Sequence, residues 1–261
     1  MLLARVADAA AQGYAREQGQ LATERERRRE RLRDLLVAEP APAHEAIAEL
    51  AVAARWDLPR SIALVALPPG APAGARILPP AVLADWEAPV PFLVVPDPEG
   101  PGQDRLWPAL RRLGTAAIGP TVPVGQGAVS LRWARHALTL IERGLLPDDG
   151  PVRCVDHIAS LAALTAEELI GATAGAVLGP LLELAPARRL PLAETLLTYL
   201  RCGDNAVIAA ERLHIHEQTV RYRLRRLTEL TGGRFTEPEG RLDVMLMLSW
   251  LVRTGRAERT A

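Results

Sequence analysis

The sequence predicts an α+β protein with a long N-terminal helix, a small α/β domain and an all-α C-terminal domain. Three observations predict this fold class. Strong helix formers dominate up to about residue 38. Short apolar runs then alternate with amphipathic stretches, and after about residue 157 only helical patterns and turns remain. We expect four parts: 1–40, a connector or dimerisation helix; 41–156, the α/β domain; 157–188, a helical linker; and 189–256, a helical domain.

The composition is that of a globular protein, and it excludes several classes of enzyme. Of 261 residues, 49% are hydrophobic and 24% are charged, and 31 basic residues balance 31 acidic ones. All the basic residues are arginines, so the lysines of P-loops, of kinases and of Schiff bases are missing. Cys154 and Cys202 lack metal-site spacing and are expected to be reduced, small core residues. No apolar run reaches the roughly 18 residues of a membrane helix, which predicts a cytoplasmic protein without membrane association.

The N-terminal stretch, residues 1–38, contains no proline and reads as one helix. Between Glu24 and Asp34 it carries six arginines and four acids. One interpretation is a basic arm on nucleic acid, and the favoured one is a solvated helix held by pairs three or four residues apart. A loose apolar stripe ends in Leu32, Leu35 and Leu36. Because so long a helix cannot bury one stripe alone, we predict that it associates with a second copy.

The middle of the chain alternates between strands and helices after a break at Pro40. Continuous apolar runs that end in proline or glycine predict buried strands, and the stretch 68–88 reads mostly as loop. The strands are expected at 61–67, 90–95, 115–118 and 152–155, and the helices at 44–54, 106–113 and 128–144.

The last 70 residues carry the most specific pattern. An apolar helical stretch at 161–184 precedes it, interrupted by glycines. Asp204 is expected to cap one helix, Ile215 fills the core at a three-residue connector, and a capping box at 236–239 starts the last helix. That last helix is apolar on several faces, so we expect it to contact a second subunit. Helices are expected at 192–200, 206–213, 217–230 and 240–253; the middle two and their connector form a helix-turn-helix.

The helix at 217–230 has one aliphatic face and one polar, basic face. At about 100° per residue, Val220, Leu224 and Leu227 face the core. Five arginines and Glu217 give residues 212–226 a charge of +4. Arginine can bind guanine and glutamine can bind adenine in a bidentate way, while other side chains reach phosphates. The candidate DNA-binding residues are His216, Gln218, Thr219, Arg221, Tyr222, Arg223, Arg225 and Arg226.

Two histidines and one glycine pair suggest other sites only weakly. His214 and His216 lie two residues apart, but no further ligand completes a metal site, so we expect them to be turn residues. Gly125-Gln126-Gly127 lacks the third glycine of a dinucleotide loop. We therefore predict no metal, no cofactor and no catalytic residues.

The C-terminal pattern resembles the PucR/CdaR family of bacterial transcription regulators. The residues that carry the resemblance are Leu192, Thr195, Leu196, Tyr199, Leu200 and Asn205, then Ala209-Ala210, Leu213-His214-Ile215-His216, Gln218 to Leu224, and Leu230-Thr231-Gly232. The family often has asparagine where this chain has Gln218, and many relatives lack the acid of Glu217.

The resemblance extends more loosely to the α/β domain, which is similar to the family's GGDEF-like domain. Gly119-Pro120-x-Val122-Pro123 and the following Ser130, Ala134, Ala137 and Leu138 carry it. Cyclases of that fold carry a Gly-Gly-Asp/Glu-Glu-Phe hairpin, and this chain contains no such string. The resemblance therefore implies a GGDEF-like domain without cyclase activity. The first helix resembles the connector that follows a sensor domain in longer relatives.

These observations predict a sequence-specific DNA-binding transcription regulator of metabolic or developmental genes, and not an enzyme. One helix-turn-helix contacts little DNA, so we expect a homodimer or higher homo-oligomer. The expected partners are double-stranded DNA and a second copy, with a small-molecule effector and RNA polymerase as further candidates. Two alternatives stay open: a nucleotide-processing or nucleotide-binding α/β enzyme with an accessory helical domain, and an interaction protein whose helix-turn-helix binds protein.

Overall fold

The computed structural model describes residues 20, 23–72, 77–100, 103–231 and 240–260. The chain divides into two compact units, which we describe separately. The first comprises residues 1–139 with 148–155, and the second comprises residues 140–147 with 156–261. The first unit contains a sheet and helices, and the second contains helices. This arrangement confirms the α+β fold class.

The first unit is built on a six-stranded sheet of order β2-β3-β1-β4-β6, with β5 paired to β1. All pairs are antiparallel except β4 with β6. The strands are β1 (Ser61–Ala66), β2 (Leu83–Asp85), β3 (Phe92–Pro96), β4 (Ala116–Ile118), β5 (Val122–Pro123) and β6 (Pro151–Arg153). The sequence did not predict β2 and β5, because two or three residues are too few to show a periodic pattern.

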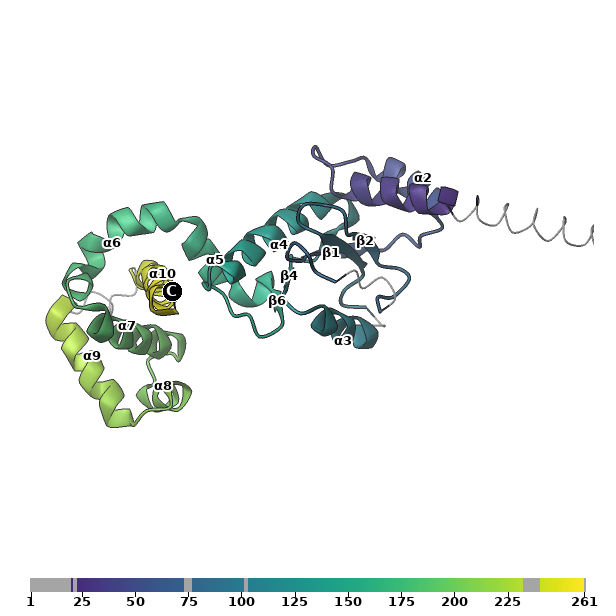
Figure 1. Ribbon diagram of the computed structural model, residues 1–261. Coiled ribbons are helices and arrows are strands. Elements are labelled where there is room, and N and C mark those ends of the chain that lie inside the picture. Colours follow the sequence, from purple (N-terminus) through teal and green to yellow (C-terminus); the bar gives the residue numbers. More distant parts are fainter. Residues whose placement is uncertain (1–19, 21–22, 73–76, 101–102, 232–239, 261) are drawn as a thin grey trace, which may run out of the picture. The chain divides into compact units, whose positions relative to one another are not determined.

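Helices cover both faces of this sheet (Figure 1). They are α2 (His44–Ala54), α3 (Gln103–Leu113) and α4 (Gly127–Glu142), with short 3₁₀ turns at Val124–Gln126 and Cys154–His157. Successive side chains of β1 point to opposite faces. Ile62 and Leu64 pack with α2 and α4, whereas Ala63 and Val65 pack with α3. Burial on both faces explains why β1 is an uninterrupted apolar run.

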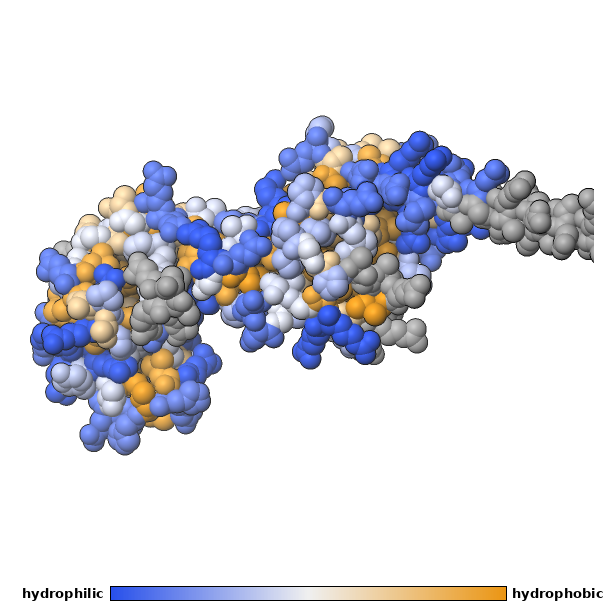
Figure 2. Space-filling view, viewed as in Figure 1, coloured by the Kyte–Doolittle hydropathy of each residue, from blue (hydrophilic) through white to orange (hydrophobic). Residues whose placement is uncertain are grey.

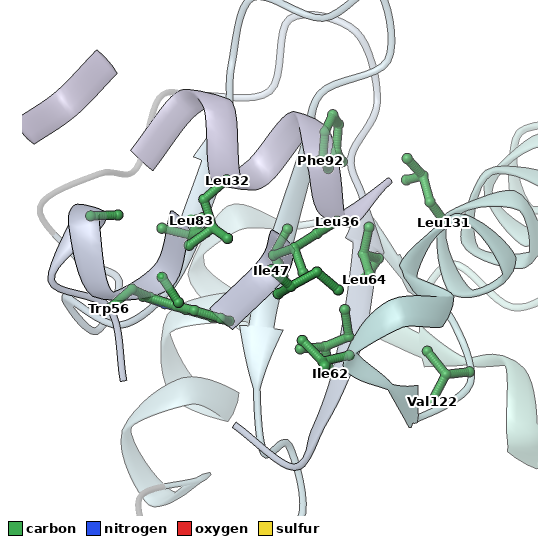
Figure 3. Packing of buried hydrophobic residues seen from close by; sticks show 14 residues of the cluster. Leu32, Leu36, Ile47, Trp56, Ile62, Leu64, Leu83, Phe92, Val122 and Leu131 are labelled. Atoms are coloured by element: carbon green, nitrogen blue, oxygen red, sulfur yellow. The ribbon is translucent and has the colours of Figure 1, made fainter. Parts of the chain in front are cut away.

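The helix at residues 23–36 belongs to the core of this unit. Leu32 and Leu36 are 0% exposed and pack against Ile47 and Leu64 (Figure 3). The described part of the apolar stripe is therefore buried by its own domain, and the prediction that it needs a second copy to cover it is wrong for this part. Leu21 and most of the residues before it lie outside the described residues.

The arginines of this helix bind the domain beside it. Arg29 Nη2 donates to the carbonyl oxygen of Pro80 at 2.6 Å, and Arg33 Nη1 donates to that of Ala84 at 3.1 Å. Arg33 also pairs with Asp85 at 3.2 Å. One pair, Glu24–Arg28 at 3.0 Å, has the spacing of four that the favoured interpretation expects.

Two glycines allow the elements of the first unit to approach closely. A Cβ atom on Gly127 would overlap the carbonyl oxygen of Leu36, and one on Gly119 would overlap that of Ser130. Ser130 is fully buried, and its Oγ accepts a hydrogen bond from the backbone N–H of Leu64 at 2.9 Å. Close packing therefore explains the glycine at position 119 and the small, hydrogen-bonding serine at position 130.

The second unit consists of helices around a central C-terminal helix (Figure 1). They are α5 (Ile158–Thr165), α6 (Glu167–Leu182), α7 (Pro186–Arg201), α8 (Ala206–Leu213), α9 (Glu217–Thr231) and α10 (Arg241–Thr260). The capping box expected at 236–239 lies outside the described residues. Helix α10 packs against α7, α6 and α5, and Leu248 is 0% exposed. Most of the apolar surface that suggested a second-subunit contact is therefore covered by the same chain, although Leu242 stays exposed.

The described residues can be compared with the requirements of a membrane-spanning helix and of a metal site. In that part of the chain, no single helix is both long and apolar enough to cross a membrane, although Cys154–Thr165 and Glu167–Leu182 pass the length and composition test as a pair bent by 77°. The same residues bring no three His, Cys, Asp or Glu side chains together in a way that could hold a metal ion.

Truncating Leu36 should destabilise the first unit. We expect Leu36→Ala to lower the free energy of unfolding by about 2–5 kcal/mol, because it leaves a cavity under the N-terminal helix. Denaturant unfolding followed by circular dichroism measures this. Val52→Ala, at a side chain that is 79% exposed, is the control and should change stability little. An equally small effect of Leu36→Ala would mean that the helix does not pack on its own domain.

The two cysteines should differ in reactivity. Burial raises the pKa of the Cys154 thiol to about 11, whereas Cys202 is half-buried. Because the thiolate is the reactive form, a thiol reagent at pH 8 should modify Cys202 rapidly and Cys154 only after unfolding. Cys202→Ala should abolish the fast phase. Since Cys154 ionises more readily in the unfolded chain, its contribution to stability should be lost as the pH rises from 9.0 to about 11.

Candidate nucleic-acid interface

Helices α8 and α9 are joined by a tight turn that sets their angle. His214 ends α8 in the left-handed region, with φ 54°. The N–H of His214 donates to the carbonyl oxygen of Glu211 at 3.2 Å, and that of Ile215 donates to Ala210 at 3.1 Å. These bonds satisfy the last carbonyls of α8, as in common helix C-caps. The chain can therefore begin α9 after only three residues.

His216 caps the start of α9. Its Nδ1 accepts a hydrogen bond from the backbone N–H of Gln218 at 3.2 Å. His214 and His216 are thus turn residues, as the sequence predicted. A contact between His216 and DNA stays a prediction.

A small core holds α8 against α9. Ala209, Ala210 and Val220 are buried, and Leu213, Ile215 and Leu224 pack around them. The two alanines let the helices approach closely, and Ile215 fills the core as predicted. Ile208 lies outside this core and is 40% exposed.

The cap of α8 is Asn205 and not Asp204. Asn205 Oδ1 accepts hydrogen bonds from the N–H groups of Val207 at 3.0 Å and Ile208 at 3.2 Å. Asp204 has φ 64°, and its two oxygens accept from Arg241 at 2.8 and 3.0 Å. Arg241 also donates to the carbonyl oxygen of Leu200 at 2.9 Å, and the hydrogen bond to Asp204 raises its guanidinium pKa. The predicted cap is therefore wrong: Asp204 instead ties the start of α10 to the turn before α8.

The outer face of α9 presents most of the predicted DNA-binding residues to solvent. Val220 and Leu227 are buried, as the angular analysis predicted. Hydrophilic side chains are prominent at the edge of the unit where α9 lies (Figure 2). Thr219 and Arg223 are half-buried. The exposed members of the set are His216, Gln218, Arg221, Tyr222, Arg225 and Arg226.

Three of the four candidate arginines on α9 already have intramolecular partners. Arg221 pairs with Glu217 at 2.5 Å and Arg226 pairs with Glu229 at 3.1 Å. Such exposed pairs contribute about 0.3–0.5 kcal/mol, so a phosphate can displace the acid. Arg223 differs, because its Nη1 donates to Oγ1 of the buried Thr195 at 3.0 Å. Arg223 therefore holds α9 on α7, a role that the sequence did not reveal.

Comparison with protein families identifies this segment. Residues 192–250 match the model of the PucR C-terminal helix-turn-helix domain. The chain carries a PucR-type helix-turn-helix domain. This result confirms the resemblance of the C-terminal segment to PucR regulators.

The chain is also similar in sequence to curated relatives, over about half of its length. Uncharacterized proteins of Mycobacterium tuberculosis and Mycobacterium bovis are each 31% identical over 134 residues, which is 46% of this chain. The chain spans only 28% of the length of these relatives. The crystal structure of a regulator of polyketide synthase expression from Bifidobacterium adolescentis is 20% identical, with a TM-score of 0.39, and the match covers 85% of this chain and 91% of that one.

Removing the cap of α8 should weaken the PucR-type domain. We expect Asn205→Ala to lower the free energy of unfolding by about 1 kcal/mol, because two N–H groups of α8 lose their acceptor. Asn205→Asp keeps an acceptor at the same place and should retain most of the stability. Thermal unfolding of both variants tests the assignment, and equal losses in the two would contradict it.

Proposed function

We propose that this protein is a sequence-specific transcription regulator that binds double-stranded DNA through α9. The observation that carries the proposal is the division of α9 into a buried aliphatic face and an exposed polar, basic face within a PucR-type domain. As part of the same proposal, the protein acts in the cytoplasm on metabolic or developmental genes.

Within the interface, we propose separate roles for the two halves of α9. The N-terminal residues of a recognition helix enter the major groove, which assigns base contacts to Gln218 and Tyr222. An amide at Gln218 can donate to and accept from adenine at once. Arg225 and Arg226 lie further along, where phosphate contacts set register without reading sequence. We assign Thr219, Arg221 and His216 to contacts with the sugar–phosphate backbone of the DNA beside them.

We propose that two copies bind one operator. A symmetric pair of recognition helices doubles the contacted sequence, which a single domain needs for useful specificity. Leu32 and Leu36 are buried in their own unit, so these two side chains are not available for this contact. A small-molecule effector and RNA polymerase remain proposed partners.

We propose that residues 41–156 form a regulatory GGDEF-like domain without turnover, beside the connector at 1–40, the linker at 157–188 and the domain at 189–256. The missing hairpin motif supports the absence of cyclase activity. Incubation of the purified protein with GTP tests it, and formation of a cyclic dinucleotide or any other product would contradict it.

Changing Gln218 should reduce specificity without changing the electrostatic part of binding. A cognate site is first selected from a random duplex library with the unaltered protein. Gln218→Ala should then cost about 1–3 kcal/mol on that site and much less on a scrambled duplex. The dependence of affinity on salt should stay the same, because no phosphate contact is lost.

Arg226→Ala is the matched comparison for the Gln218 experiment. It should weaken binding to both duplexes equally and lower the slope of log affinity against log salt by about 0.9. Equal weakening of both duplexes by Gln218→Ala would show that Gln218 holds the backbone. Absence of binding to any selected duplex by the full chain would refute the proposed function itself.

A further inference from the structure

An open groove separates the start of α7 from the second half of α9. Its volume is about 590 Å³. Arg188 and Pro191 of α7 line one side, and residues 222–229 of α9 supply the other. Four arginines line the groove: Arg188, Arg223, Arg225 and Arg226. Among the lining residues, Glu229 is the single acid. The groove therefore concentrates positive charge on a chain whose net charge is zero.

The arginines of this groove are not equally engaged. Arg223 donates to Thr195, and Arg226 pairs with Glu229. Arg188 and Arg225 are both exposed, and within the described residues neither guanidinium group forms a hydrogen bond or an ion pair. Two guanidinium groups without partners thus face solvent beside the same groove. A planar guanidinium with five donors suits phosphate oxygens.

When a helix lies in the major groove of DNA, a sugar–phosphate backbone of the duplex comes next to the groove between α7 and α9. An α-helix with its side chains is about 10–12 Å across, and the major groove is about 12 Å wide. A recognition helix therefore fills the major groove of the DNA. The protein elements on either side of that helix then lie over the two sugar–phosphate backbones. Helix α8 packs by the first half of α9, whereas the start of α7 lies by the second half.

We propose that the groove between α7 and α9 binds the sugar–phosphate backbone, with Arg188 and Arg225 as phosphate ligands. This inference rests on the proposed function, since it assumes that α9 enters DNA. It assigns to Arg188, which lies outside the two helices of the helix-turn-helix, a direct contact with the duplex. Glu229 competes for Arg226 in the free protein and gives it up when a phosphate arrives.

The test measures binding of the full chain to cognate and scrambled duplexes over a range of salt concentrations. Arg188→Ala should lower the slope of log affinity against log salt by about 0.9 on both duplexes. The same loss corresponds to about eightfold weaker binding at 0.1 M monovalent salt. Arg112→Ala, which removes an exposed arginine from α3 in the other unit, is the control and should leave both values unchanged.

Glu229→Gln gives a second readout that a merely structural role would not move. Removing this carboxylate frees Arg226 and takes away a charge that repels phosphate, so affinity for both duplexes should rise several-fold and the salt slope should steepen. Weaker binding by this variant would contradict the proposal.

The outcomes separate this inference from the proposed function. If Arg188→Ala leaves affinity and slope unchanged while Gln218→Ala still weakens binding to the cognate duplex, the recognition helix contacts DNA and the groove beside α7 does not. If Arg188→Ala alters transcription from a cognate promoter without altering DNA binding, the groove contacts an acidic protein surface and the proposal is overturned. Loss of binding to only the cognate duplex would mean that Arg188 reads bases and would overturn it too.

Discussion

The contact between Ala209 and Ala210 of α8 and Val220 of α9 is the constraint on which the interface depends. Only small side chains let two helices lie so close, and this closeness fixes which face of α9 turns outward. The left-handed cap at His214 and the cap from His216 hold the same geometry from the connector. A larger residue at either alanine would push α9 out of register with every polar side chain that it presents.

Arginine has two different roles in this protein. Arg29, Arg33 and Arg241 donate to backbone carbonyl oxygens and hold one element on another, and Arg223 donates to Thr195. A guanidinium can do this because it carries several donors and stays charged. In a chain without lysine, a local count of arginines therefore overstates the charge available to DNA. The exposed arginines without partners, such as Arg225, are the better guide to an interface.

The helix at residues 23–36 and α9 each have one buried apolar face and one face rich in arginine. On the helix at residues 23–36, Leu32 and Leu36 enter the core while arginines bind the rim of the domain. On α9, Val220 and Leu227 enter the core while the opposite face stays in solvent. The two helices look alike in sequence, since both are rich in arginine with a leucine stripe. They differ in where the guanidinium groups find acceptors. Arg29 and Arg33 bind carbonyl oxygens of the neighbouring loop and strand, whereas the exposed Arg221 and Arg226 pair with carboxylates of α9 itself.

The sequence by itself determined the elements whose patterns are long and periodic. The continuous apolar run of β1 indicated a strand buried on both faces, and the helix at His44–Ala54 and the faces of α9 follow from a period of 3.6 residues. Tertiary structure alone decided the three-residue β2, the partner of the leucine stripe and the cap of α8. It also placed Arg188 beside α9, which begins 29 residues further along the chain. Periodicity records only which side of an element is apolar, and the identity of the neighbour depends on contacts between residues distant in sequence.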